Sequence, residues 1–134
     1  AHAIGSQYPD GSLVGSCSYS HMTVFSFHAI KTLTTGEGGC VTTNDEKLYK
    51  RLLKIRNSGI ERHEHLTQGT PAPWYYEVQE LSGNYHMTEM QAALGLSQLQ
   101  RLDAFVEKRK NIVSWYRSHL ANHPHIRLFD AATD

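Results

Sequence analysis

The chain has 134 residues, 40% of them hydrophobic and 19% charged, which is enough for one core and too little for two comfortable domains. Thirteen basic residues balance thirteen acidic ones, so the chain has no excess of positive charge to attract a nucleic-acid backbone or an anionic membrane surface. We expect neither as a partner. No apolar run reaches the roughly eighteen residues of a membrane span, and the well-separated Cys17 and Cys40 favour reduced thiols in the cytoplasm.

The first part of the chain predicts a loop followed by two strands. Residues 1–20 are rich in glycine, serine and turn signals, and the turn at residues 9–11 indicates a hairpin-like loop. Residues 22–27 are rich in β-branched and aromatic side chains and predict a strand, and residues 39–43 predict a second strand. Lys31 therefore falls on the loop between two strands.

The middle of the chain predicts a helix and a long loop. Thr43 and Glu46 have the spacing of a capping box before apolar residues at helical spacing, and the helix should stop at residues 58–59. Residues 60–83 show no sustained period, which indicates a long loop of the kind that is often functional.

The last third predicts two further helices. Thr88 and Gln91 repeat the capping-box pattern, and Asp103 can cap a helix whose apolar stripe, residues 105–120, should pack in the core. Strands, glycine turns and helices together favour an α/β fold.

Lys31 is the residue whose setting suggests chemistry. It follows a strand with a buried pattern and lies among hydroxyls and glycines. Carbonyl cofactors react with the neutral amine of a lysine, which partial desolvation favours, and hydroxyls such as that of Ser26 can hold a phosphate. Taken alone, the same pattern also fits a turn lysine between two strands, and the glycines match no nucleotide-binding motif.

Four motifs occur in one order: residues 1–5 (AHAIG), 26–31 (SFHAIK), 36–39 (GEGG) and 84–95 (NYHMTEMQAALG). Through them the chain resembles the sugar aminotransferases of the DegT/DnrJ/EryC1/StrS family from one end to the other. Residues 15–20, 25–28 and 74–77 resemble the branch of that family that makes pseudaminic-acid precursors.

The resemblance implies a site. Lys31 would be the lysine that holds pyridoxal 5'-phosphate as a Schiff base, and Ser26 would donate its hydroxyl to the cofactor phosphate. His2 matches the position beside the cofactor ring, and Asn84 matches an asparagine that reaches the phosphate from the neighbouring subunit of a homodimer. His86 stands where the family usually has arginine, so the contact of that arginine is in question.

The resemblance also implies the architecture. We expect part of a fold-type-I, aspartate-aminotransferase-like enzyme, cut at both ends from a longer chain. Residues 1–101 would form the second half of the cofactor-binding large domain with the lysine loop, and residues 102–134 the connecting helix and the start of the small C-terminal domain. The carboxylate that pairs with the pyridine nitrogen would then lie upstream of Ala1, so residues 1–134 alone should be inactive.

The reaction implied is transamination of a UDP-linked 4-keto-6-deoxy-N-acetylhexosamine, with glutamate as amino donor, in the synthesis of cell-surface sugars of the pseudaminic-acid type. Two alternatives stay open. One is another 4-amino-sugar transaminase, of the 4-amino-arabinose or perosamine type. The other is a non-catalytic oligomerisation domain that keeps the fold.

Histidines and aromatic residues of the loops offer further candidates. The pairs His63/His65 and His123/His125 lack recognisable carboxylate or cysteine partners, so we expect no metal site. His28 is either a hydrogen-bonded structural residue or a catalytic base. The aromatic residues 74–76 could line a sugar-nucleotide pocket or anchor the long loop.

Overall fold

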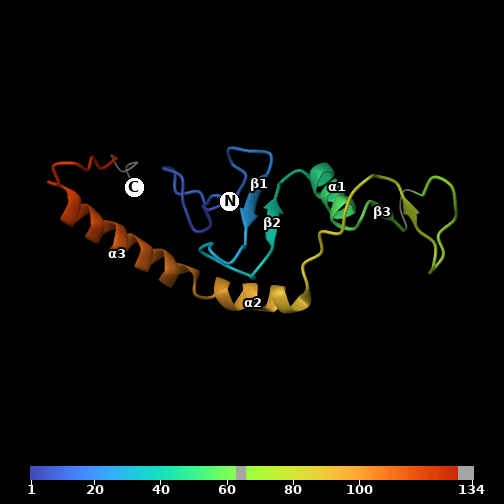
Figure 1. The fold of residues 1–134 in the computed structure, drawn as a ribbon. Helices are drawn as coiled ribbons and strands as arrows, with labels where there is room; N and C mark the ends of the chain where they lie inside the picture. Colours follow the sequence, from blue (N-terminus) through green and yellow to red (C-terminus); the bar gives the residue numbers. More distant parts are fainter. Residues whose placement is uncertain (63–65, 130–134) are drawn as a thin grey trace.

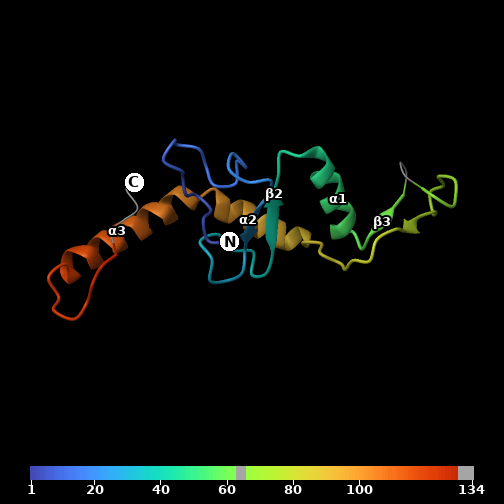
Figure 2. The same ribbon diagram turned by 90° about the horizontal axis from the view of Figure 1, so that it is seen from above.

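The structure, a computed structural model, describes residues 1–62 and 66–129. Its strands and helices follow one another in a mixed order, as the predicted α/β class requires. They are β1 (Thr23–Ser26), β2 (Gly39–Thr42), α1 (Glu46–Arg56), β3 (Ile60–Glu61), β4 (Glu77–Val78), α2 (Glu89–Leu99) and α3 (Leu102–Leu120). The molecule is elongated: α2 and α3 follow one another along one side of the β1–β2 pair, and β3 and β4 lie at the opposite end from α3 (Figures 1 and 2).

Strands β1 and β2 are the predicted pair. They run antiparallel, with Thr23 opposite Thr42 and Ser26 opposite Gly39. The ring of Phe25 is buried on β1, and a Cβ at Gly15 would lie 2.8 Å from that ring, so the N-terminal loop closes over it.

The N-terminal segment is the predicted hairpin-like loop. A single antiparallel bridge joins Gln7 and Leu13. Gly5 has a positive φ of 81°, and a Cβ there would lie 3.0 Å from Cγ2 of Val106. The chain at Gly5 therefore lies directly against the first turns of α3, where a larger residue would crowd Val106 and take up a strained backbone conformation.

Helix α1 forms where predicted, but the predicted capping box of Thr43 and Glu46 is wrong. Asp45 is the N-cap, and its Oδ1 accepts hydrogen bonds from the backbone amides of Lys47 and Leu48. The hydroxyl of Thr43 instead donates to the carbonyl of His21 at 2.7 Å. The same hydroxyl oxygen accepts a hydrogen bond from the amide of Asp45 at 3.1 Å. Thr43 therefore lies ahead of the helix, held by a tertiary contact and by the turn that leads to the cap.

Residues 60–83 are less irregular than predicted. Two short strands, β3 and β4, pair antiparallel with Ile60 opposite Val78. The carboxylate of Glu77, the first residue of β4, accepts hydrogen bonds from the backbone amides of Thr67, Gln68 and Gly69 in the loop between the two strands. Hydrogen bonds from the Thr67 amide, the Gln79 side chain and the Gln68 amide hold the pKa of Glu77 well below its usual range, although partial desolvation opposes the shift. One carboxylate thus organises this loop.

Helix α2 begins as predicted, with a complete capping box between Thr88 and Gln91. The predictions for α3 are wrong in two respects. Asp103 lies in its first turn, and the N-cap position is occupied by Arg101, which makes no side-chain capping bond. The apolar stripe is not core either, because α3 contains no buried residue and Tyr116 is 54% exposed. None of the helices within the described residues is long and apolar enough to cross a membrane.

Candidate active site

The loop between β1 and β2 carries Lys31 and is closed at its base by backbone hydrogen bonds. The amide of Phe27 donates to the carbonyl of Gly38 at 2.7 Å, and the amide of Thr35 donates to the carbonyl of Phe27 at 2.9 Å. The amide of Lys31 donates to the carbonyl of His28 at 2.9 Å. These bonds fix the path of the backbone on both sides of Lys31. Lys31 itself is half-buried.

Two predicted site residues that are far apart in the sequence meet in the structure. Nζ of Lys31 lies 2.8 Å from Nε2 of His2. The amide of Ser26 donates to the carbonyl of Ala1 at 3.4 Å, which places the N-terminal segment beside the end of β1. A lysine amine and an imidazole nitrogen at hydrogen-bonding distance can exchange or share a proton, with roles that depend on the tautomer of His2.

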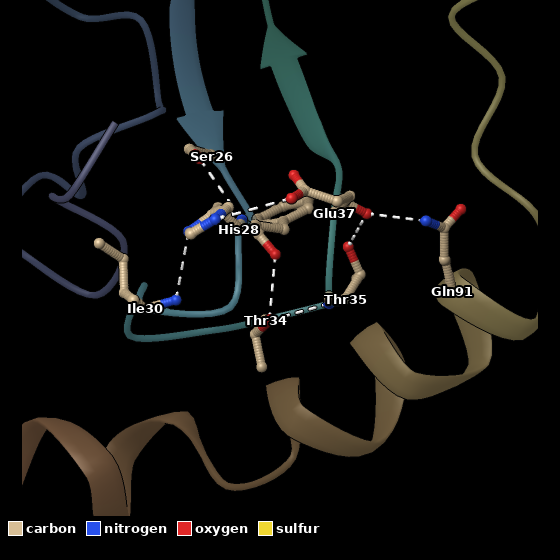
Figure 3. A network of polar contacts seen from close by, with 9 residues as sticks. Ser26, His28, Ile30, Thr34, Thr35, Glu37 and Gln91 are labelled. Atoms are coloured by element: carbon tan, nitrogen blue, oxygen red, sulfur yellow. Dashed lines mark hydrogen bonds and ion pairs between the residues drawn. The ribbon is translucent and has the colours of Figure 1, made fainter.

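Ser26 is the last residue of β1 and lies close to the start of the lysine loop (Figure 3). Its hydroxyl oxygen accepts a long hydrogen bond, 3.4 Å, from the amide of His28. Within residues 1–62 and 66–129, nothing accepts the hydroxyl proton of Ser26. The hydroxyl can therefore donate to an anionic ligand, as the predicted contact with a cofactor phosphate requires.

His28 takes part in the loop's internal bonding. Its Nδ1 lies 3.4 Å from the amide of Ile30, and its Nε2 lies 3.6 Å from Oε1 of Glu37 (Figure 3). These contacts support the interpretation of His28 as a hydrogen-bonded structural residue. Glu37, the partner of His28, is not among the predicted site residues, although a lone glutamate between glycines at residues 36–39 is a signal in the sequence.

Asn84 does not join this group within the chain. It lies on the segment between β4 and α2, where its Oδ1 accepts from the amide of His86 at 3.1 Å. Its backbone forms an isolated bridge with Asn57, whose Oδ1 lies 3.0 Å from Nε2 of His86. The predicted contact of Asn84 from a neighbouring subunit stays a prediction.

The remaining candidates are loop residues. His63 and His65 lie outside the described residues, and the rings of His123 and His125 are 6.1 Å apart. The described part of the chain contains no group of three or more histidine, cysteine or acidic side chains that could hold a metal ion. Trp74 is 79% exposed, whereas the Tyr76 ring lies under the guanidinium group of Arg62.

Comparison with known proteins gives this geometry its context. The family model for the DegT/DnrJ/EryC1/StrS aminotransferase family matches residues 1–134. A relative from Campylobacter jejuni (serotype O:23/36, strain 81-176), named UDP-4-amino-4,6-dideoxy-N-acetyl-beta-L-altrosamine transaminase, is 37% identical over 116 residues. That match covers 87% of this chain and 28% of the relative.

Two solved structures are similar in fold. The Helicobacter pylori aminotransferase PseC, involved in pseudaminic-acid biosynthesis, has a TM-score of 0.79 at 35% identity, over 92% of this chain and 30% of that one. The candidate sugar aminotransferase Spr1654 from Streptococcus pneumoniae, in its PLP form, has a TM-score of 0.73 at 36% identity, over 91% and 29%. The chain therefore spans about three tenths of the length of the proteins it matches.

Proposed function

Because the chain belongs to the DegT/DnrJ/EryC1/StrS aminotransferase family, we propose that it supplies the cofactor-bearing lysine of a pyridoxal-phosphate-dependent sugar aminotransferase. The observation that carries the proposal is the 2.8 Å contact between Nζ of Lys31 and Nε2 of His2. It brings an amine on a closed loop against an imidazole from a segment 29 residues away. A lysine that only occupied a turn between two strands would not require a partner from a remote segment.

The residues present fit the cofactor. Lys31 offers an amine, Ser26 a hydroxyl that can donate to a phosphate, and His2 a flat ring beside the amine. Bound pyridoxal phosphate supplies an electron sink for transamination. Lys31 then acts as the base that takes a proton at Nζ and returns it, and His2 holds the amine in the required direction.

For the substrate, we propose a UDP-linked 4-keto-6-deoxy-N-acetylhexosamine with glutamate as the amino donor. The naming of the Campylobacter relative and of PseC supports this class of sugar. We propose a homodimer in which Asn84 completes the phosphate site of the neighbouring subunit. The two free thiols, Cys17 and Cys40, support the cytoplasm as the compartment.

For the architecture, we propose that residues 1–101 belong to the large domain and residues 102–134 to the connecting helix and the start of the small domain. The end of α2 at Leu99 and the non-helical backbone of Arg101 (φ −107°, ψ 4°), just before α3, support this boundary.

The test is an assay of the full-length protein with glutamate and either UDP-4-keto-6-deoxy-N-acetylhexosamine or GDP-4-keto-6-deoxymannose. We expect amination of the UDP sugar by the wild-type protein and no product with Lys31→Ala. Preference for the GDP sugar would replace the proposed substrate with one of the perosamine type. Absence of cofactor binding in the full-length protein would overturn the enzymatic function and favour a non-catalytic domain.

A further inference from the structure

The backbone carbonyl of Glu37 joins the lysine loop to helix α2. This oxygen accepts a hydrogen bond from Oγ1 of Thr35 at 2.8 Å and another from Nε2 of Gln91 at 3.0 Å (Figure 3). Gln91 is 54 residues further along the chain than Glu37. The attachment is therefore a tertiary contact, and it reaches the loop on the side where the chain returns to β2.

Thr35 is the buried end of this attachment. It is 3% exposed and is the buried polar residue of the described chain. A Cβ at Gly95 of α2 would lie 2.9 Å from Cγ2 of Thr35, so the helix approaches the loop at van der Waals distance. The amide of Thr35 also donates to the carbonyl of Phe27, which joins this contact to the base of the loop.

Gln91 uses both ends of its side-chain amide. Its Oε1 accepts from the backbone amide of Thr88 at 2.9 Å, which forms the capping box of α2, while its Nε2 donates to Glu37. A helix cap needs only the acceptor, because the orphan group at a helix start is an N–H. The donor end is thus available for the loop, and a glutamate in its place would preserve the cap alone.

We propose that Gln91 is a positioning residue that holds the lysine loop against α2 and so sets the place of Lys31. The inference rests on the proposed function of Lys31, which it deepens by naming a residue that acts on the lysine through the loop. Gln91 touches neither Lys31 nor His2, and its effect passes through Glu37 and Thr35 to the hydrogen bonds at the loop base.

The test compares Gln91→Glu with Gln98→Glu in the full-length protein. Both changes add the same charge to α2, but only the first replaces the donor to Glu37 by an acceptor. The first readout, made without cofactor, is hydrogen exchange of peptides covering residues 27–38. We expect exchange at least threefold faster in Gln91→Glu than in Gln98→Glu, with protection at the start of α2 unchanged.

The second readout is the rate at which added pyridoxal phosphate and borohydride label Lys31, which we expect to fall by at least threefold in Gln91→Glu. Thr35→Val, which keeps the shape of the side chain but loses its donor, should act in the same direction, whereas Thr35→Ser should retain the loop's protection. Equal loop protection in Gln91→Glu and Gln98→Glu would overturn the inference. The two proposals can fail separately. If Gln91→Glu speeds exchange in the loop but the wild-type protein is not labelled at Lys31, the proposed function is overturned and the attachment of the loop by Gln91 is supported.

Discussion

At the scale of single residues, the neighbour of its amine distinguishes Lys31 from Lys50 of α1. Lys31 faces an imidazole nitrogen of His2, whereas Lys50 lies 3.0 Å from a carboxylate oxygen of Glu46. An ammonium group held in an ion pair has no lone pair to offer an aldehyde. We therefore expect Lys31 to be the amine that reacts.

The first prediction concerns the site of covalent attachment. With pyridoxal phosphate bound, borohydride should fix the cofactor on the peptide that contains Lys31, as peptide mass spectrometry can show. Lys31→Ala should remove the label and the activity, while the free energy of unfolding changes by less than about 1 kcal/mol, because a loop lysine contributes little to the core. Label recovered on Lys50 or Lys54 instead would contradict the assignment.

The second prediction concerns His2. His2→Ala removes the partner of the Lys31 amine, so labelling of Lys31 should slow by roughly fivefold, since one lost hydrogen bond is worth about 1 kcal/mol. His2→Gln keeps an acceptor of similar reach and should slow labelling by less than about twofold. Labelling at the wild-type rate in both variants would show that the contact does not orient the amine.

At the scale of elements, Glu77 is the clearest case of a fold set by one side chain. Its carboxylate bonds three successive backbone amides of the loop between β3 and β4, and also the hydroxyl of Tyr75 and the amide of Gln79. Removing the charge leaves these donors without an anionic acceptor, and charge-assisted bonds are the stronger kind.

The third prediction follows from the lowered pKa of Glu77. A carboxyl whose folded pKa is depressed stabilises the folded loop fully above its ordinary value of 4.5, and that stabilisation is lost as the pH falls below 4.5 towards the lowered value. Amide protection factors at residues 67–69, corrected for the intrinsic effect of pH on exchange, should therefore fall on acidification. Glu77→Gln should show low protection already at pH 7, whereas Glu107→Gln, on the exposed surface of α3, should match the wild type. If the amides of residues 67–69 are as well protected in Glu77→Gln as in the wild type, the charge of the carboxylate does not stabilise the loop.

At the scale of the whole molecule, the buried interior is very small. Phe25 and Leu33 are the hydrophobic residues buried within the described chain, while large apolar side chains on both α2 and α3 are exposed. A domain of this size normally hides well over half of the surface of its unfolded chain, which is its main source of stability. The described residues therefore lack the interior of an independent domain.

The fourth prediction is that residues 1–134 by themselves neither unfold cooperatively nor transaminate, whereas the full-length protein does both. The exposed apolar stripe of α3 and the open edges of the β1–β2 pair should favour self-association. Thermal unfolding, size-exclusion chromatography and the sugar assay, run side by side, check this. Comparable turnover by the short chain would show that the catalytic residues are misplaced.

The fifth prediction tests a site shared between subunits. Full-length Asn84→Ala and Lys31→Ala should each be inactive or weak alone. Heterodimers should regain up to about half of the wild-type activity per dimer, because one of the two sites then carries both intact residues. No recovery in heterodimers whose formation has been verified would assign Asn84 to its own chain.

Several features could be predicted from the sequence because they depend on near neighbours. The strands around Lys31 follow from β-branched and aromatic runs, and the cap of α2 follows from a threonine and a glutamine three residues apart. The roles of the site residues follow from the resemblance of whole motifs. The physical pattern around Lys31 and Ser26 is compatible with a site but does not prove one, and no such pattern distinguishes His2 or Asn84.

Tertiary structure decided the rest, because the partners concerned are remote in the sequence and compete with local ones. The meeting of His2 with Lys31 depends on how the N-terminal segment lies along β1, and the bond from Gln91 to Glu37 depends on how α2 crosses the lysine loop. Thr43 has the spacing of a cap, yet its hydroxyl donates to the remote carbonyl of His21 and accepts from the amide of Asp45, and Asp45 caps the helix. Local spacing shows which bonds a side chain can make, and only the folded chain selects among them.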